Sequence, residues 1–173
     1  IIVTGDSAGA YLATYLVALS ANPELADKIS APRIKVNLRA LVSFCGVYDF
    51  EETLKHPIPL GMTKSIGQDF LGFKFNKDLS NYVEYPMLVE ASPCNFVNEK
   101  WPSSFLIMSE KDVFCAGQGE ALEAKLQELG VPVRTYKTQK VLDNHCFHLD
   151  LYRKQSKLCL AEVFKFLEEI VNE

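Results

Sequence analysis

The sequence lacks three features that each mark a large class of proteins. It has no uninterrupted apolar run of the roughly 18 residues that a membrane-spanning helix needs, and Asp6 already breaks the apolar opening. Lys and Arg are scattered without any basic run, and the formal net charge is −4. We therefore expect no membrane span, and no nucleic acid or anionic membrane surface as a partner.

Patterned cysteines are missing as well. The five cysteines are odd in number, and none belongs to a Cys-x-x-Cys pair. This argues against a disulfide framework and against a zinc site, and it favours free thiols in a reducing, cytoplasmic compartment. The sequence also shows no internal repeat and no inter-domain linker, so its 173 residues fit one ordinary domain.

Strand and helix patterns alternate along the chain. Short apolar runs predict strands, and apolar residues at helical spacing predict helices. The strands are expected at 1–3, 38–44, 104–108 and 133–136, and the helices at 8–20, 119–129 and 152–171. This order predicts an α/β fold with an open, mostly parallel sheet and helices on both faces. The first residue already lies in a strand, which suggests a sheet that is cut part-way through.

Leucine and other large apolar residues predict which face of each helix is buried. The faces expected to be buried are Leu12, Leu16 and Leu19 in the first helix, Leu122, Leu126 and Leu129 in the second, and Leu160, Val163, Phe164, Leu167 and Val171 in the last.

The stretch 47–100 interrupts the alternation and is rich in Phe, Tyr, Pro and Gly. We expect short helices and turns there, and no strand of the sheet. In an α/β fold such an insertion commonly sits above the strand ends as a cap whose aromatic residues line a pocket. The alternative is that these aromatic residues pack only a small core of the insertion itself.

A Gly-x-Ser-x-Gly motif lies between the first expected strand and the first expected helix. It reads Gly5-Asp6-Ser7-Ala8-Gly9. A serine on such a sharp strand-to-helix turn is a nucleophile elbow, which exposes the hydroxyl above the sheet. Gly5 and Gly9 are expected to relieve crowding at the turn, and the Ala8 N–H is expected to donate to an oxyanion. The alternative is a glycine-rich turn that happens to contain serine.

A serine nucleophile needs a base and an acid that orients the base, in the chain order Ser, Asp or Glu, His. Asp112 follows the strand expected at 104–108 and is the preferred acid. Glu110 is the local competitor. A solvated loop carboxylate or a helix cap is the structural alternative for Asp112.

The chain has three histidines as candidate bases. His56 precedes the acid and is out of order. His145 lies in the polar part of the loop before the last helix and is preferred over His148, which suits a buried structural role. The His145 and His148 pair has metal-ligand spacing but no convincing third ligand nearby, so no metal is expected. Cys115 and Cys146 do not lie on an elbow and are expected to be unreactive thiols.

Several segments together resemble the second half of an α/β-hydrolase. They are GDSAGAYLA, LVSFCGVYDF, ASPCNF, PSSFLIMSEKDVF, GEALEAKLQELGVPVRTY and HCFHL. The chain is most similar to the hormone-sensitive-lipase-like carboxylesterases, and also resembles the small esterase/lipase group that includes formamidase-type enzymes. The resemblance covers nearly the whole chain outside 50–90. It places the nucleophile at Ser7, the acid at Asp112 and the base at His145, with Cys146 where glycine is frequent.

The resemblance also implies what surrounds these segments. Family members carry a glycine-rich H-G-G-type oxyanion segment and further strands before the elbow. We therefore expect residues 1–173 to be the C-terminal part of one α/β-hydrolase domain with a cap-like insertion at 47–100. The expected reaction is acyl transfer on a small, apolar ester without any cofactor. An amide or formamide hydrolase with the same triad and a non-catalytic ligand-binding homologue are the alternatives.

Overall fold

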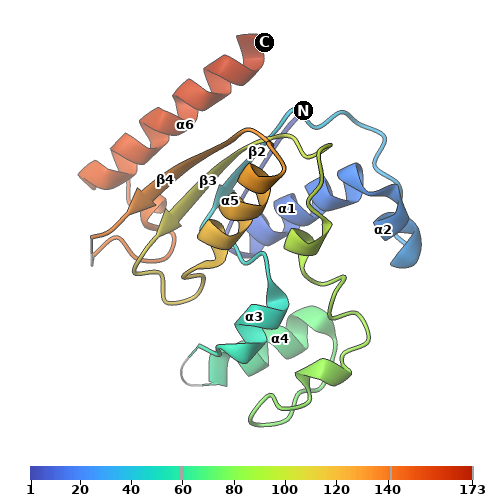
Figure 1. Cartoon of the computed structure of the whole chain (residues 1–173). Coiled ribbons are helices and arrows are strands. Elements are labelled where there is room, and N and C mark those ends of the chain that lie inside the picture. Colours follow the sequence, from blue (N-terminus) through green and yellow to red (C-terminus); the bar gives the residue numbers. More distant parts are fainter. Residues whose placement is uncertain (59–60, 141, 173) are drawn as a thin grey trace.

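A computed structural model describes residues 1–58, 61–140 and 142–172 (Figure 1). The described strands form one parallel sheet in the order β1-β2-β3-β4. Their bounds are Ile2–Asp6 (β1), Ala40–Phe44 (β2), Ser103–Ser109 (β3) and Val133–Thr138 (β4). Because all four strands run the same way, their carboxyl ends lie at one edge of the sheet. The predicted α/β class with a parallel sheet is confirmed.

Helices cover both faces of the sheet, as predicted. One face packs against α1 (Ala8–Ala21) and α5 (Gln118–Glu128), and the other against α6 (Lys154–Asn172), while α2 (Pro23–Lys28) packs beside the end of α1. Leu41 and Leu106 point to the first set of helices, whereas Val42 and Phe105 point to α6. Side chains alternate between the faces of a strand, so β2 and β3 need apolar residues at nearly every position.

The buried faces of the helices agree with those expected only in part. Leu16 and Leu19 of α1 and Leu160 and Leu167 of α6 pack against the core from partly buried positions, as expected. In α1 the residues against the sheet are small, Ala10, Ala13, Val17 and Ala18, while Leu12 is 58% exposed. Small side chains let the helix lie close to the sheet. The prediction of the buried face relied on leucine positions and therefore did not include these small residues. In α6 the buried residues are Cys159, Val163, Phe166 and Ile170, whereas Phe164 and Val171 are exposed. In α5, Leu122 and Leu126 are buried but Leu129 is partly exposed.

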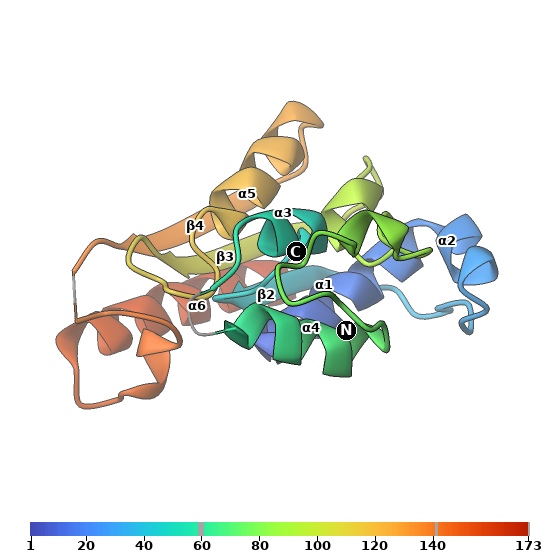
Figure 2. The ribbon, with the colours of Figure 1, turned by 90° about the horizontal axis from the view of Figure 1, so that it is seen from below.

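The insertion folds over the edge of the sheet where the strands end (Figure 2). It contains α3 (Phe50–Lys55), α4 (Met62–Leu71) and two 3₁₀ turns (Tyr82–Glu84 and Pro93–Phe96), and no strand among its described residues. Gly61 and Gly72 flank α4 with positive φ, a conformation that glycine adopts without strain. Leu54, Phe75 and Leu79 form a small core inside it.

In the described part of the chain, no helix has both the length and the apolar content to cross a lipid bilayer. The five cysteines are all free thiols.

Candidate active site

Ser7 occupies a strained turn between β1 and α1. Its φ of 54° and ψ of −116° lie outside the regions that side chains favour. The turn is held by the Ser7 N–H, which donates to the Phe44 carbonyl at 2.9 Å. A Cβ placed on Gly5 would lie 2.0 Å from the Gly9 carbonyl oxygen, so only glycine fits there. A Cβ placed on Gly9 meets no heavy atom of the described residues within 4 Å, so the expected crowding at Gly9 is not found.

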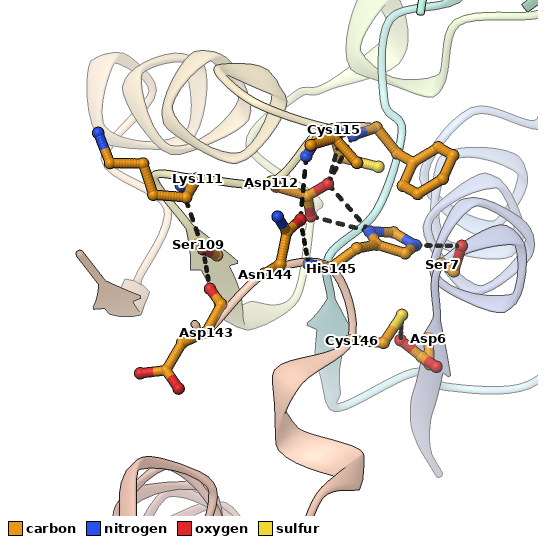
Figure 3. A network of polar contacts seen from close by, with 12 residues as sticks. Asp6, Ser7, Ser109, Lys111, Asp112, Cys115, Asp143, Asn144, His145 and Cys146 are labelled. Atoms are coloured by element: carbon orange, nitrogen blue, oxygen red, sulfur yellow. Dashed lines mark hydrogen bonds and ion pairs between the residues drawn. The ribbon is translucent and has the colours of Figure 1, made fainter. Parts of the chain in front are cut away.

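Three side chains from distant loops meet at the carboxyl edge of the sheet (Figure 3). His145 Nε2 lies 2.8 Å from Ser7 Oγ. The other ring nitrogen, Nδ1, lies 3.0 and 2.9 Å from the two carboxylate oxygens of Asp112. All three distances are hydrogen-bond distances, so a proton can pass from the serine hydroxyl to an imidazole that a carboxylate orients.

Asp112 is buried but well supplied with donors. Its Oδ1 accepts hydrogen bonds from the N–H groups of Phe114 at 2.8 Å and Cys115 at 2.9 Å. Burial alone would raise the pKa of this carboxyl, but the His145 ring and the two N–H groups outweigh it and hold the pKa below its usual range. Glu110, the competing acid, is exposed and lies near Lys111 instead.

Two residues before His145 fix its loop. Asn144 Oδ1 accepts from the N–H groups of His145 at 2.7 Å and of Val113 at 3.2 Å, which ties the base loop to the acid loop. The Asp143 carboxylate is buried and accepts from Thr138 Oγ1 at 2.9 Å, with Arg153 Nη1 at 3.2 Å. The sequence analysis missed both roles. The signal available was an Asp-Asn pair directly before the candidate base.

The residues after His145 contact Asp6 of the elbow. Cys146 has a left-handed backbone, and its thiol donates to Asp6 Oδ1 at 3.0 Å. His148 is buried and stacked on Phe44 at 4.2 Å, with Nε2 3.6 Å from Asp6 Oδ1. Burial lowers the pKa of His148, and the Asp6 carboxylate opposes this in part. Among the described residues, no hydrogen bond joins His148 to Ser7.

The remaining candidates lie apart from this centre. His56 is exposed on the insertion, 3.7 Å from Glu52. His145 and His148 face different carboxylates, Asp112 and Asp6, so they do not form a metal-binding pair. Burial raises the pKa of Cys115 and Cys146, so neither is a thiolate nucleophile near neutral pH.

Cys45, Asp112 and His145 place one potential metal-ligand atom each within 4.8 Å of the others. Burial raises the pKa of the Cys45 thiol to about 12, so it stays protonated near neutral pH. The Asp112 carboxylate already accepts from His145 and two N–H groups. The donors therefore suit support of the imidazole better than the binding of an ion.

A cavity of about 310 Å³ opens from Ser7 and His145 toward the insertion. Its walls are largely apolar and include Tyr11, Val47, Phe50, Leu54, Ile58, Ile66, Phe70 and Phe114. The hydroxyls in the wall are already engaged: Thr53 donates to the Asp49 carbonyl, Thr63 accepts from the Ile58 N–H, and Tyr11 donates to the Ala91 carbonyl. Aromatic residues of the insertion thus both line this cavity and pack its small core.

Ala8 borders the same cavity. It is the first residue of α1, so its N–H has no acceptor within the helix. The N-terminus of α1 also carries the positive end of the helix dipole. The site thus places beside Ser7 an N–H donor that has no acceptor among the described residues.

Comparisons with known proteins point to esterases. The family model described as BD-FAE matches residues 1–126. Esterase LipQ of Mycobacterium tuberculosis (strain ATCC 25618 / H37Rv) is 32% identical over 140 residues, which are 79% of this chain and 30% of that protein.

Two solved structures share the fold. Esterase B from Lactobacillus rhamnosis has a TM-score of 0.73 at 18% identity, covering 99% of this chain and 53% of that one. Carboxylesterase Cest-2923 from Lactobacillus plantarum also has a TM-score of 0.73, at 12% identity, covering 98% and 58%. The chain therefore spans between about a third and three fifths of the length of these proteins.

Proposed function

This chain belongs to the BD-FAE family, and we propose that it hydrolyses carboxylic esters through a Ser-His-Asp acyl-enzyme mechanism. One observation carries the proposal. A continuous series of hydrogen bonds runs from Ser7 Oγ through His145 to Asp112, directly beside an apolar cavity. We assign Ser7 as nucleophile, His145 as general base and acid, and Asp112 as the orienting carboxylate.

In the first half-reaction, Ser7 Oγ attacks the ester carbonyl carbon while His145 Nε2 takes the hydroxyl proton. The ionised Asp112 stabilises the imidazolium that forms. The carbonyl oxygen becomes an oxyanion, which the Ala8 N–H stabilises. His145 then returns the proton to the leaving alcohol, and the carbon–oxygen bond to that alcohol breaks. In the second half-reaction, water attacks the acyl carbon while His145 Nε2 takes its proton. The bond between that carbon and Ser7 Oγ then breaks, His145 returns the proton to Ser7 Oγ, and the carboxylic acid leaves.

The proposed substrates are small, apolar esters. The cavity beside Ser7 has apolar walls, and the hydroxyls of Thr53, Thr63 and Tyr11 are already hydrogen-bonded within the protein. A polar substituent would lose its water there and find few partners, because the Thr53 and Tyr11 hydroxyls already donate within the protein. Each buried methylene, in contrast, contributes about 0.8 kcal/mol. We therefore expect butyrate esters to be preferred over esters of hydroxylated acids of similar size.

The test of the nucleophile uses the full-length protein and Ser7→Ala. With p-nitrophenyl butyrate, kcat should fall by at least about 10³-fold, because no hydroxyl remains to form the acyl-enzyme. Ser80→Ala, at an exposed serine of the insertion, serves as the control and should keep full activity. A fluorophosphonate probe should label Ser7, as located by mass spectrometry. Full activity in Ser7→Ala would contradict the assignment.

The same experiment separates the alternatives. An amide hydrolase uses the same three residues but has to expel a poorer leaving group. Comparing p-nitrophenyl butyrate with the matching p-nitroanilide gives the ratio of ester to amide turnover directly. A non-catalytic ligand-binding protein would show neither turnover nor labelling of Ser7 in the full-length protein.

A further inference from the structure

Two hollows of the described structure share a wall. The first is the 310 Å³ cavity beside Ser7, called here the ester cavity. The second, called the outer groove, measures about 470 Å³ and is lined by Tyr15, Lys28, Ile29, Ser30, Leu71, Tyr85, Met87, Glu90 and Ala91. Of the residues that the structure describes, only Tyr11 and Phe70 border both hollows, so these two rings separate them.

Tyr11 is the fixed part of this wall. It lies one helical turn after Ser7, and its N–H donates to the Ser7 carbonyl at 3.1 Å. Its hydroxyl donates to the Ala91 carbonyl at 2.9 Å, and its ring meets Phe50 edge-on at 5.1 Å. The ring is therefore held at both ends in a set position relative to the nucleophile.

Phe70 is the replaceable part. It lies in the last turn of α4 and is 40% exposed. Its ring meets Tyr11 edge-on at 5.0 Å and stacks on Phe50 at 5.5 Å. The phenylalanine ring has no polar atom that a hydrogen bond could anchor, so its position depends on apolar and aromatic contacts such as these. Removing the ring opens the wall, while Tyr11 keeps its hydrogen bond to Ala91 and its contact with Phe50.

Building on the proposed ester hydrolysis, we propose that Phe70 closes the ester cavity against the outer groove and so limits the length of the apolar chain that the enzyme accepts. With Phe70 present, a chain longer than the cavity has to leave its end in water. With Phe70 shortened, the end of the substrate's apolar chain enters the outer groove, which Tyr15 and Tyr85 line. Each further methylene buried there should raise kcat/KM by about fourfold.

The experiment measures kcat/KM of the full-length protein for p-nitrophenyl esters from acetate to dodecanoate. For Phe70→Ala, the ratio of decanoate to butyrate should rise at least about tenfold over that of the wild type. The matched control is Phe73→Ala, because Phe73 lies in the same insertion, is partly buried and borders neither hollow. That variant should leave the ratio unchanged.

Two further variants test the proposal if Phe70→Ala does not fold. Phe70→Leu should raise the ratio of decanoate to butyrate kcat/KM by a smaller amount. Phe70→Trp keeps the wall closed and should not raise this ratio. An unchanged ratio in folded Phe70→Ala or Phe70→Leu, with butyrate hydrolysis intact, would overturn the role of Phe70 alone. Absence of hydrolysis of every ester by the wild type, together with no probe labelling of Ser7, would overturn the proposed function and this inference with it.

Discussion

Cys146 shows how a single residue can join the two loops of the candidate site. Its φ of 55° and ψ of 31° are left-handed, which costs a residue with a Cβ about 1 kcal/mol or more. The sequence analysis noted only that relatives often carry glycine here, and the backbone supplies the physical reason. The thiol offsets the strain by donating to Asp6 Oδ1 at 3.0 Å, which ties the residue after His145 to the residue before Ser7.

We therefore predict that Cys146→Gly lowers kcat about fivefold to tenfold, because the imidazole loses this tether and its geometry toward Ser7 becomes less fixed. Thermal stability should change little, since relief of the left-handed strain offsets the lost hydrogen bond. Cys146→Ser keeps a donor to Asp6 and should retain activity within about twofold. Steady-state kinetics and thermal unfolding of both variants measure these effects. Equal losses of kcat in the two variants would show that the hydrogen bond to Asp6 does not position His145.

At the scale of elements, the elbow between β1 and α1 is set by close approach of backbones. A Cβ on Gly5 would meet the carbonyl oxygen of Gly9 at 2.0 Å, and backbone atoms of a strand and a helix cannot move aside cheaply. Gly9 has free space around it among the described residues and lies in the first turn of α1. The two glycines of one motif therefore have different physical roles.

The expected result is a large difference between two equivalent substitutions. Gly5→Ala should destabilise the fold by about 3 kcal/mol or more, since the clash cannot relax. Gly9→Ala should leave stability unchanged or raise it by up to about 1 kcal/mol, because alanine is the better helix former. Urea unfolding of both variants measures the difference. Similar losses of unfolding free energy in the two variants would mean that the close approach of Gly9 to Gly5 does not determine the conformation of the turn.

The sequence predicted the existence of these elements better than their packing. The apolar run 38–44 predicted a strand, and the structure forms one over Ala40–Phe44, where every side chain is buried, as in a parallel sheet that is covered on both faces. The buried face of α6 was predicted in part: Val163 is buried and Leu160 and Leu167 pack against the core, but Phe164 and Val171 are exposed and Cys159 was not counted. Pro23 follows α1 directly and starts α2 as a first-turn proline, a short helix that the apolar spacing did not indicate.

At the scale of the whole molecule, the candidate catalytic residues lie together at one edge of the sheet. Parallel strands bring the elbow after β1, the loop after β3 and the loop after β4 to the same edge, where Ser7, Asp112 and His145 meet. Order along the chain and position after strands were enough to select these residues. Asn144, Asp143 and Phe70 were not predicted, because their roles arise from contacts between loops that periodicity does not encode.

His148 connects the elbow, the sheet and α6. It packs on Phe44 of β2, lies near Asp6, and its carbonyl accepts from Ser156 Oγ of α6 at 2.5 Å. Burial lowers its pKa from the usual 6.5, Asp6 acts in the opposite direction, and His145 adds to the lowering. The unfolded chain therefore binds a proton at a higher pH than the folded chain does. Its contribution to stability is complete above pH 6.5 and is lost as the pH falls below that value.

The melting temperature of the full-length protein should therefore fall between pH 7 and pH 5, before any loss from Asp112, whose lowered pKa keeps its contribution until more acidic conditions. His148→Phe removes the titrating group but keeps an aromatic ring against Phe44. Nδ1 of His148 has no hydrogen-bond partner among the described residues, so no bond is lost at that atom. Thermal unfolding across this range should show a shallower slope for His148→Phe than for the wild type. Parallel slopes would place the pH sensitivity elsewhere in the molecule.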